Sequence, residues 1–424
     1  MICSIISIGT ELSLGLIFNE NSKYIAERVT DMGLECKYMF TVRDSVEEIV
    51  NVLKQSLRYS DLIIVNGGLG PTDDDITRKA VAQVLKLKLI RDKSLDETSL
   101  KFIRKIKNKR ITERLLRQSY IPEGSFPIKP KIGSASGFRA MLGNRKIIFC
   151  IPGVPKEMIS MFKEDIEPFL KKKIEKDLKE KGLKIKKSIL LTTDISETEI
   201  EEKVKEIVDE AKEINVQIGI TANPGLTKIM LVAKAMDVIK AGENLRKIEK
   251  KILNKLGSCF YGKDNSLISD NLKETIKKTG SNLTISTAES VTGGLISSIL
   301  TDTPGSSEFF LGGIVSYSNY SKVKLLNVDK SILEKYGAVS REVCIEMAKK
   351  VKRIFNSDYS LSVTGYAGPE AENKKIGLVY CCILGPDCYE KIYEKFFQGT
   401  RSEIKFRTAQ FILNELRKSI NERC

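Results

Sequence analysis

Residues 285–294, ISTAESVTGG, contain the strand-to-helix junction around which the C-terminal part of the chain is organised. β-Branched and small residues come first and predict a strand, and the Gly-rich turn that follows predicts the start of a helix. Such a turn brings backbone N–H groups together near the hydroxyl of Ser290, as an oxyanion site requires. Two interpretations stay open from these residues alone: Ser290 is a nucleophile, or the segment is an ordinary helix start with Thr292 as its N-cap.

The chain of 424 residues contains no histidine, which excludes a Ser-His-Asp triad, a histidine-ligated metal and imidazole acid–base catalysis. A nucleophilic serine would need a lysine, a tyrosine, a carboxylate or a metal ion, and a lysine is a base only if burial or a nearby cation lowers its pKa. A short strand predicted over 313–317 ends at Tyr317, and Lys322 follows at the start of a predicted helix. Taken alone, each is more typical of a strand-end aromatic residue or a surface lysine.

Four segments of this region resemble the C-terminal domain of the CinA family, the nicotinamide-nucleotide amidases. They are TAESVTGG at 287–294, SYSNYSKVKLL at 316–326, GAVS at 337–340 and VTGYAGP at 363–369. The resemblance covers residues 263–424, and it implies that Ser290 is the nucleophile and that Tyr317 and Lys322 form its activating pair. The family usually has Cys where this chain has Val291, and the side chain at this position has no role in the proposed reaction.

The resemblance implies hydrolysis of the carboxamide of nicotinamide mononucleotide to nicotinic acid mononucleotide and ammonia, in pyridine nucleotide salvage. Ser290 would attack the amide carbon while Lys322, kept neutral by burial, or Tyr317 accepts its proton. Backbone N–H groups around Val291–Gly293 would stabilise the oxyanion. No cluster of metal-ligating residues stands out in this segment, so we expect an amidase without a metal or other cofactor.

A nucleotide substrate also needs a cradle for its ribose and phosphate. The loop after a strand predicted over 359–363 lies at a strand end, like the turn after Ser290. Arg401, at the start of the last predicted helix, could pair bidentately with phosphate; an exposed first-turn position and Arg407 are the alternatives. The predicted substrate-binding residues are Thr292, Gly293, Gly294, Thr364, Gly365, Gly368 and Arg401.

Composition and charge restrict the class of protein. The chain is 42% hydrophobic and 29% charged, as in soluble globular proteins, and no stretch approaches the roughly 20 apolar residues that span a bilayer. The apolar N-terminal run fits a first strand better than a signal peptide, so we expect a cytoplasmic protein without membrane contact. The formal charge of +15 permits binding of nucleic acid or phosphorylated substrates, but its lysines are spread over helices without interleaved aromatics. A solvated lysine-rich surface is the favoured interpretation, and nucleic-acid binding is not expected.

Alternating strands and helices in the N-terminal part predict a parallel, doubly wound α/β sheet. We expect strands over 3–9 and 61–68 and helices over 21–32, 42–60 and 75–85. Ligands of such sheets bind at the carboxyl ends of the strands.

The loop NGGLGPTDDDITR, 66–78, stands at one of these ends. Its glycines let the backbone approach a phosphate, and the predicted binding residues are Gly67, Gly68, Gly70 and Thr72. Three consecutive aspartates, 73–75, would repel a phosphate unless a divalent cation bridges them. An acidic N-cap with solvated neighbours explains the same residues equally well.

Residues 1–170 resemble the N-terminal domain of the same family, which is similar to the molybdopterin-binding MoaB/MogA fold. The matching segments are SIGTEL, NENSKYIAERV, GGLGPTDDDIT and IPGVPKEM. The resemblance implies that Asp44 and Asp75 serve a ligand and its metal, with Asp74 beside them, and that the domain is an ADP-ribose pyrophosphatase dependent on a divalent metal such as Mg or Co. The chain departs from the family pattern at Lys129 and at GSASG, 133–137, which weakens that implication.

The segment 171–262 reads as a charged helix end and linker followed by a small α+β module. We expect a strand over 186–193, a helix begun by the capping box Ser196–Glu199, strands near 216–222 and 228–235, and a helix ending before Gly257. The module resembles the KH-like middle domain of CinA proteins. It lacks the GxxG loop of nucleic-acid-binding KH modules, so a spacer or dimerisation role is favoured.

The expected architecture is three domains, 1–170, 171–262 and 263–424, in a homodimer acting on small nucleotide substrates. The competing hypothesis is a non-catalytic protein that binds a pterin or nucleotide and has a competence- or DNA-linked partner role. Salt dependence separates them, because DNA binding weakens steeply with salt through counterion release and amide hydrolysis does not.

Overall fold

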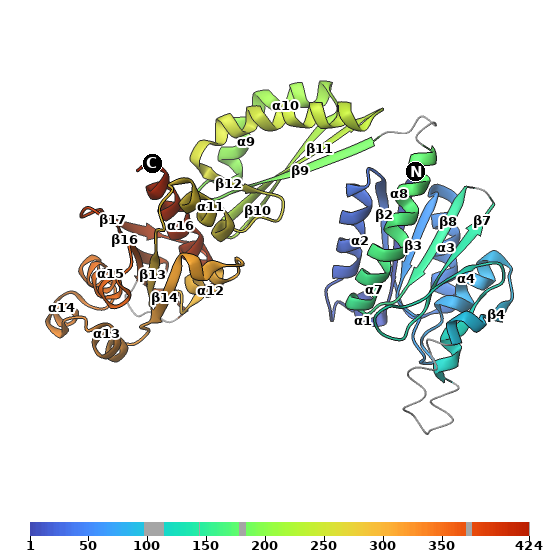
Figure 1. Ribbon diagram of the computed structural model, residues 1–424, viewed down its shortest axis with the longest axis horizontal. Helices are drawn as coiled ribbons and strands as arrows, with labels where there is room; N and C mark the ends of the chain where they lie inside the picture. The colour runs from blue at the N-terminus through green and yellow to red at the C-terminus, as the bar shows by residue number, and fades with distance from the viewer. Residues whose placement is uncertain (97–113, 144, 178–183, 370–374, 424) are drawn as a thin grey trace. The chain divides into compact units, whose positions relative to one another are not determined.

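The computed structural model describes residues 1–96, 114–143, 145–177, 184–369 and 375–423 of the chain (Figure 1). The chain divides into two compact units, one formed by Met1–Lys187 with Ala233–Glu243 and the other by Ser188–Val232 with Asn244–Cys424. Within the charged run 171–187, residues 178–183 lie outside the described part of the chain. Each unit has its own sheets and cores.

The first unit is built on a six-stranded sheet of order β2-β1-β3-β8-β7-β6. The strands β2, β1, β3 and β8 run parallel, and β7 and β6 are antiparallel additions at one edge. The strands are β1 Ile2–Ile8, β2 Glu35–Val42, β3 Leu62–Asn66, β6 Phe126–Ile128, β7 Gly137–Leu142 and β8 Lys146–Ile151.

Helices cover both faces of this sheet, which explains why its central strands are apolar runs and do not alternate with polar residues (Figure 1). On β1, Ile5 belongs to the core under α2 (Glu20–Asp31), α7 (Pro155–Met161) and α8 (Glu167–Asp177). The next residue, Ile6, belongs to the opposite core, under α3 (Val46–Tyr59) and α4 (Thr77–Leu85). The predicted doubly wound α/β fold is confirmed.

Short elements complete this unit. They are α1 Thr10–Ser13, the β4 Leu89–Arg91 and β5 Tyr120–Pro122 pair, the 3₁₀ turn Arg117–Ser119 and the π-helical turn Phe162–Ile166 between α7 and α8.

A four-stranded sheet of order β10-β11-β9-β12 lies mostly in the second unit, and the first residues of β9 and the last residues of β11 belong to the first. Its strands are β9 Lys184–Thr192, β10 Val216–Asn223, β11 Leu226–Ala235 and β12 Phe260–Lys263. The helices of this module are α9 (Glu197–Glu213) and α10 (Val238–Leu256). The predicted capping box is present, because Ser196 accepts from the Glu199 N–H and the Glu199 carboxylate accepts from the Ser196 N–H.

A five-stranded sheet of order β14-β13-β15-β16-β17 forms the rest of the second unit. β14, β13 and β15 are parallel, and β16 and β17 pair antiparallel beyond β15. The strands are β13 Ile285–Glu289, β14 Phe310–Val315, β15 Tyr359–Gly365, β16 Leu378–Leu384 and β17 Glu390–Phe396.

Neighbouring positions of β13 again face different cores. Ile285 packs with α11 (Ile268–Lys278), α12 (Leu295–Thr301) and α16 (Arg401–Asn421). Ala288 packs with α13, α14 and α15. These three helices span Asn319–Leu326, Lys330–Tyr336 and Arg341–Phe355.

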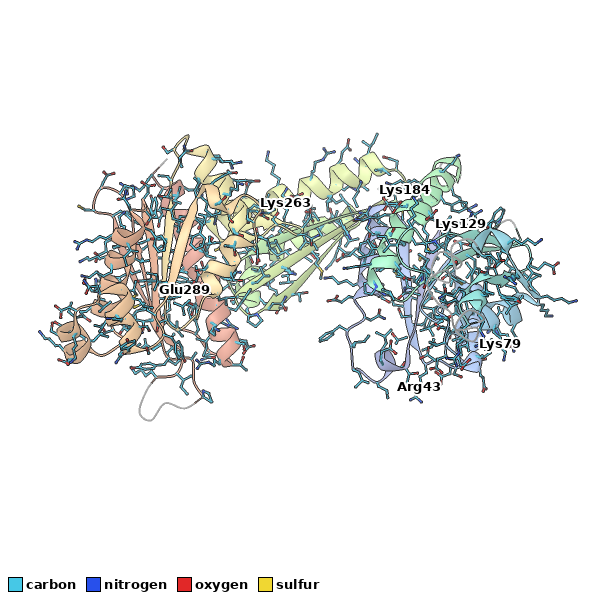
Figure 2. The ribbon with its side chains drawn as sticks, turned by 60° about the horizontal axis from the view of Figure 1, so that its bottom comes forward. Arg43, Lys79, Lys129, Lys184, Lys263 and Glu289 are labelled. Atoms are coloured by element: carbon cyan, nitrogen blue, oxygen red, sulfur yellow. The ribbon has the colours of Figure 1, made fainter. Side chains whose placement is uncertain are left out.

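No helix within the described residues is long and apolar enough to cross a membrane. The lysines that dominate the charge are distributed over many elements, as the labelled Lys79, Lys129, Lys184 and Lys263 illustrate (Figure 2).

Candidate active site

Three parallel strands of the five-stranded sheet end at one edge, and each delivers a polar residue there. Ser290 follows β13, Ser316 and Tyr317 follow β14, and Thr364 is the penultimate residue of β15. The strand predicted over 313–317 ends earlier, at Val315. The Ser316 N–H still donates to the Glu289 carbonyl, and the backbone carbonyls of Ser316 and Tyr317 accept hydrogen bonds from Lys322.

The turn after Ser290 depends on two glycines. Gly293 and Gly294 have φ values of 61° and 97°, a left-handed conformation that other residues adopt at a cost. The helix α12 begins at Leu295 with Gly294 as its N-cap and without a side-chain cap. The alternative in which Thr292 is the N-cap is therefore wrong, because the Thr292 hydroxyl donates to Glu289.

The carboxylate of Glu289 stabilises this turn by accepting hydrogen bonds from it. Its side chain is fully buried at the carboxyl end of β13, which lies between β14 and β15 (Figure 2). The carboxylate accepts from the backbone N–H groups of Gly294, Ile296 and Ser297 and from the hydroxyls of Thr292 and Ser297. A carboxylate at a helix N-terminus is favoured by the helix dipole and by the unpaired N–H groups there. Glu289 lies inside the segment TAESVTGG, yet the sequence analysis gave it no role.

Few N–H groups of the turn remain for an oxyanion. The Gly293 N–H donates to the carbonyl of Ser290, and the Gly294 N–H donates to Glu289. Among the described residues, the N–H groups of Val291 and Thr292 have no hydrogen-bond acceptor. Of the predicted donors around Val291–Gly293, these two are available.

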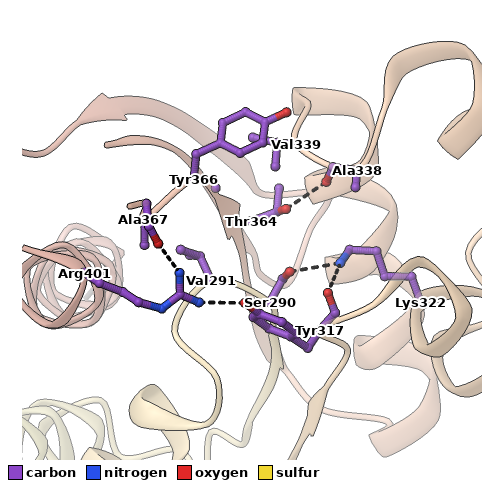
Figure 3. A pocket seen from close by; sticks show the side chains of 12 residues that line it. Ser290, Val291, Tyr317, Lys322, Ala338, Val339, Thr364, Tyr366, Ala367 and Arg401 are labelled. Carbon is purple, nitrogen blue, oxygen red and sulfur yellow. Dashed lines mark hydrogen bonds between the residues drawn. The ribbon is translucent and has the colours of Figure 1, made fainter. Parts of the chain in front are cut away.

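Lys322 points its amino group at the serine (Figure 3). It is only 1% exposed, and its Nζ lies 2.9 Å from Ser290 Oγ, 2.8 Å from the Ser316 carbonyl oxygen and 3.4 Å from that of Tyr317. Burial lowers the pKa of Lys322 from 10.5 to about 8. Because no carboxylate within the described residues forms an ion pair with it, nothing restores the charged form, and the lysine is suited to accept a proton near neutral pH.

A cavity of about 270 Å³ opens beside this pair (Figure 3). It is lined by Ser290, Val291, Tyr317, Lys322, Ala338, Val339, Thr364, Gly365, Tyr366, Ala367, Gly368 and Arg401. The structure thus brings Ser290, Tyr317, Lys322, Thr364, Gly365, Gly368 and Arg401 together as predicted neighbours. Thr292, Gly293 and Gly294 do not line this cavity.

Tyr317 and Arg401 meet at the rim. Arg401 donates to the hydroxyl of Tyr317 at 2.6 Å and to the carbonyl of Gly368 at 2.5 Å. The Tyr317 side chain is 60% exposed, and its hydroxyl is hydrogen-bonded to Arg401, with no hydrogen bond to Ser290 within the described structure. The two members of the predicted activating pair therefore differ, since only Lys322 contacts the serine.

The far wall of the cavity is held by Thr364. Its buried hydroxyl donates to the carbonyl of Ala338 at 2.8 Å, which ties the loop before α15 to the end of β15. Ala338, Val339, Tyr366 and Ala367 line the cavity although the sequence analysis assigned them no site role. The signal was available, because all four lie in the segments GAVS and VTGYAGP.

In the first unit, Asp75 stabilises the loop 66–75 by accepting hydrogen bonds from it, as Glu289 stabilises the turn after Ser290. Its two carboxylate oxygens accept from the N–H groups of Gly70 and Thr72 and from the Thr72 hydroxyl. Asp75 is not the N-cap of α4, which begins at Thr77 after Ile76. The predicted phosphate-binding residues Gly70 and Thr72 thus already donate to a carboxylate of the chain.

Gly67 and Gly68 shape the same loop. Both have positive φ, 107° and 64°, and a Cβ on them would come within 2.4 Å of the Ile8 carbonyl oxygen and 2.3 Å of the Thr77 hydroxyl. These glycines are required by close packing of the loop on its own domain, whatever the loop binds.

The aspartates proposed as metal ligands do not assemble into a ligand set. Asp44 accepts from the N–H and hydroxyl of Thr10, and Asp73 pairs with Arg114 and Arg117. Throughout the described ranges, no three Asp, Glu or Cys side chains group closely enough to hold a metal ion. The prediction of a metal site at Asp44, Asp74 and Asp75 is not supported by this geometry.

The GSASG segment, 133–137, is anchored by hydrogen bonds to other parts of its domain. Arg78, almost fully buried, donates to the carbonyls of Leu69, Gln118 and Ser136 and so ties three loops together. Burial lowers the pKa of Arg78 to about 10. The Ser134 N–H donates to Glu157, which fixes the other end of the segment.

Comparisons with known proteins identify the family of the chain. Three family models match in succession: a probable molybdopterin binding domain over residues 4–172, the KH domain of damage-inducible protein CinA over 187–262 and the CinA C-terminal domain over 268–420. A putative competence-damage inducible protein of Halothermothrix orenii is 38% identical over 97% of this chain and 96% of its own length. The chain belongs to the CinA family.

Other members resemble it similarly. A CinA-like protein of Dictyoglomus thermophilum is 37% identical over 99% of both chains. A crystal structure of CinA with unknown function from Thermoplasma acidophilum is 30% identical and covers 39% of this chain and 96% of its own, with a TM-score of 0.36. This CinA protein therefore combines a MoaB/MogA-like N-terminal domain, a KH-like middle module and the CinA C-terminal domain.

Proposed function

We propose that the C-terminal domain is an amidase that hydrolyses nicotinamide mononucleotide to nicotinic acid mononucleotide and ammonia. The observation that carries the proposal is the 2.9 Å contact between Lys322 Nζ and Ser290 Oγ in a buried site that has no histidine. A serine beside a lysine whose pKa is lowered to about 8 is an activated nucleophile.

In the first half of the reaction, neutral Lys322 accepts the hydroxyl proton while Ser290 Oγ attacks the carboxamide carbon. The carbonyl oxygen becomes an oxyanion, and the N–H group of Val291, which lines the cavity, is the donor left to stabilise it, contributing about 3 kcal/mol if well aligned. Lys322 then passes its proton to the amide nitrogen. The C–N bond breaks, ammonia leaves, and an ester joins the acyl group to Ser290.

In the second half, water attacks the ester carbon and Lys322 accepts the proton of that water. The bond between the acyl carbon and Ser290 Oγ breaks, and Lys322 returns the proton to the serine. The carbonyls of Ser316 and Tyr317 hold the lysine in place through both halves, because they accept its other N–H groups.

The nucleotide end of the substrate would lie toward Arg401. Two of the five N–H groups of this arginine are used by Gly368 and Tyr317, which leaves three for a phosphate. The existing bonds also fix the plane of the guanidinium, which favours bidentate phosphate binding.

The test is ammonia release from nicotinamide mononucleotide by the purified full chain and its Ser290→Ala and Asp75→Ala variants. We expect release by wild type and Asp75→Ala, and loss of at least a thousandfold in Ser290→Ala. Full activity of Ser290→Ala would refute the assignment of the nucleophile.

No release by wild type would instead favour the competing hypothesis, a non-catalytic nucleotide- or pterin-binding protein with a DNA-linked partner. We do not extend the proposal to an ADP-ribose pyrophosphatase in the first domain. Asp75 is engaged by its own loop, and the predicted metal ligands do not group within the described residues.

A further inference from the structure

A second cavity, of about 400 Å³, lies in the second unit between the KH-like module and the C-terminal helix. Its walls come from the β9–α9 loop, the β10–β11 hairpin, the end of β17 and α16. It shares no lining residue with the cavity beside Ser290. The lining residues are Thr193, Asp194, Ile195, Ser196, Glu197, Glu199, Ala222, Asn223, Gly225, Leu226, Thr227, Phe397 and Arg407.

Arg407 is the cationic group of this cavity. Within the described residues it has no ion-pair partner and no side-chain hydrogen bond, and its Nε is buried without an acceptor. Arg401, on the same helix, has both a carbonyl and a hydroxyl as acceptors. A guanidinium that is partly withdrawn from water without an acceptor is costly unless a ligand supplies one.

The carboxylates of the cavity are mostly engaged elsewhere. Asp194 accepts from Asn414 at 2.7 Å and Lys418 at 3.3 Å, and Glu199 is held by the Ser196 capping box. Glu197 is exposed in the first turn of α9. Glu403, one turn before Arg407, accepts from the Thr400 N–H. None of these four forms an ion pair with the arginine in the described structure.

The cavity is held open by hydrogen bonds of its own walls. The Thr193 hydroxyl donates to the Gly225 carbonyl and the Thr227 hydroxyl donates to the Ile195 carbonyl, which fasten the hairpin to the loop. Asp194 has a φ of 61°, in the left-handed region that Asp adopts more readily than most residues. These two hydrogen bonds fix the hairpin relative to the loop, and ligand sites are usually preformed in this way.

One wall is apolar. Phe397 packs against Phe411 with ring centroids 6.0 Å apart, so its face is fixed, and Leu226 and Ile195 lie on the opposite elements. A single cation beside a fixed aromatic ring suits a ligand with one oxyanion and a flat or apolar body.

We propose that this cavity binds a small organic phosphate or carboxylate of up to mononucleotide size, with its oxyanion paired to Arg407 and its body against Phe397. The volume of about 400 Å³ lies within the range of small-molecule sites. The site is distinct from the proposed amidase site and does not depend on that activity.

The test is calorimetric titration of the full chain with adenosine monophosphate in buffer free of phosphate. Arg407→Gln should weaken binding at least tenfold, and Arg353→Gln, the same change at an exposed position of α15, should leave this binding unchanged. Arg401→Gln tests whether the ligand instead occupies the cavity beside Ser290. Asn223→Glu places a negative charge at an exposed lining position, and it should weaken binding even if Arg407→Gln fails to fold.

Two results would overturn the proposal. One is the absence of saturable binding by wild type at millimolar ligand. The other is binding that survives both Arg407→Gln and Asn223→Glu, including the case in which only Arg401→Gln removes it and the ligand therefore occupies the cavity beside Ser290.

Discussion

Lys322 Nζ and Ser290 Oγ lie 2.9 Å apart, and the two other acceptors of this lysine are backbone carbonyls. A neutral amine has two N–H groups and one lone pair. With the carbonyls of Ser316 and Tyr317 taking the N–H groups, the lone pair is left for the serine hydroxyl. The arrangement therefore directs the basic electron pair of the lysine at the atom that must lose a proton.

The first prediction concerns pH. Since Lys322 must be neutral to act as base and its pKa is lowered to about 8, kcat/KM for ammonia release should fall about tenfold per pH unit below pH 8 and level off above it. The measurement is a profile from pH 5.5 to 9.5. A rate that is flat across pH 6 to 8 would contradict a lysine base.

The second prediction is that the lysine lowers stability. Its pKa is about 8 in the folded protein and 10.5 in a free side chain, so below pH 8 the folded state carries the full cost of the buried charge. Lys322→Met should raise the free energy of unfolding at pH 7 by up to about 3 kcal/mol while abolishing activity.

This gain should shrink between pH 8 and 10.5, where the unfolded wild type binds a proton that the folded state has released. Urea unfolding at pH 7 and pH 10 checks it, with Lys324→Met on the same helix as the control. If Lys322→Met raised the free energy of unfolding more at pH 10 than at pH 7, the prediction that the buried charge destabilises the folded state would be contradicted.

The third prediction separates the two candidate proton acceptors. Tyr317→Phe removes only a hydroxyl that accepts from Arg401, so it should raise KM by several-fold and change kcat less than tenfold. Lys322→Ala should lower kcat by at least a thousandfold. Steady-state kinetics of the two variants decide the matter, and a collapse of kcat in Tyr317→Phe would transfer the role of base to the tyrosine.

The fourth prediction concerns Glu289. Glu289→Gln sets an NH₂ group against donors that need an acceptor, so we expect a loss of about 3 kcal/mol or more in unfolding free energy and little residual amidase activity. Glu334→Gln, at an exposed helix pair, should change stability by less than about 1 kcal/mol. Equal stability of the two variants in urea would remove Glu289 from its organising role.

The fifth prediction is that ammonia release does not need a divalent metal. Among its lining residues the cavity beside Ser290 has no Asp, Glu, His or Cys, the side chains that usually ligate one. Activity should persist in excess EDTA. A loss that added metal restores would contradict this.

The fold followed from the sequence where hydrophobic pattern and turn residues agreed. The helix predicted over 21–32 is α2, Glu20–Asp31, and the capping box at Ser196 is present. The predicted end of β14 was two residues too late, because Ser316 and Tyr317 belong to the turn whose carbonyls accept hydrogen bonds from Lys322. No local pattern contains that information.

The candidate site was predictable to the level of residue types and their strand ends. Ser290 and Lys322 were paired by resemblance, and the structure supplies the contact between them. The sequence did not predict that Glu289 and Asp75 stabilise their own loops, and one reason explains both cases. Both stand in Gly-rich segments that suggest a bound anion, and sequence alone does not reveal that the anion is a side chain of the segment itself.

This internal carboxylate has a consequence for selectivity. With the negative charge of Glu289 already seated at the start of α12, free phosphate and other inorganic anions in solution gain nothing by approaching the Ser290 turn. Under the proposed function, the turn would receive the uncharged carboxamide and Arg401 would bind the phosphate. In the proposed amidase, free phosphate should therefore compete with the substrate at Arg401 and not at the Ser290 turn.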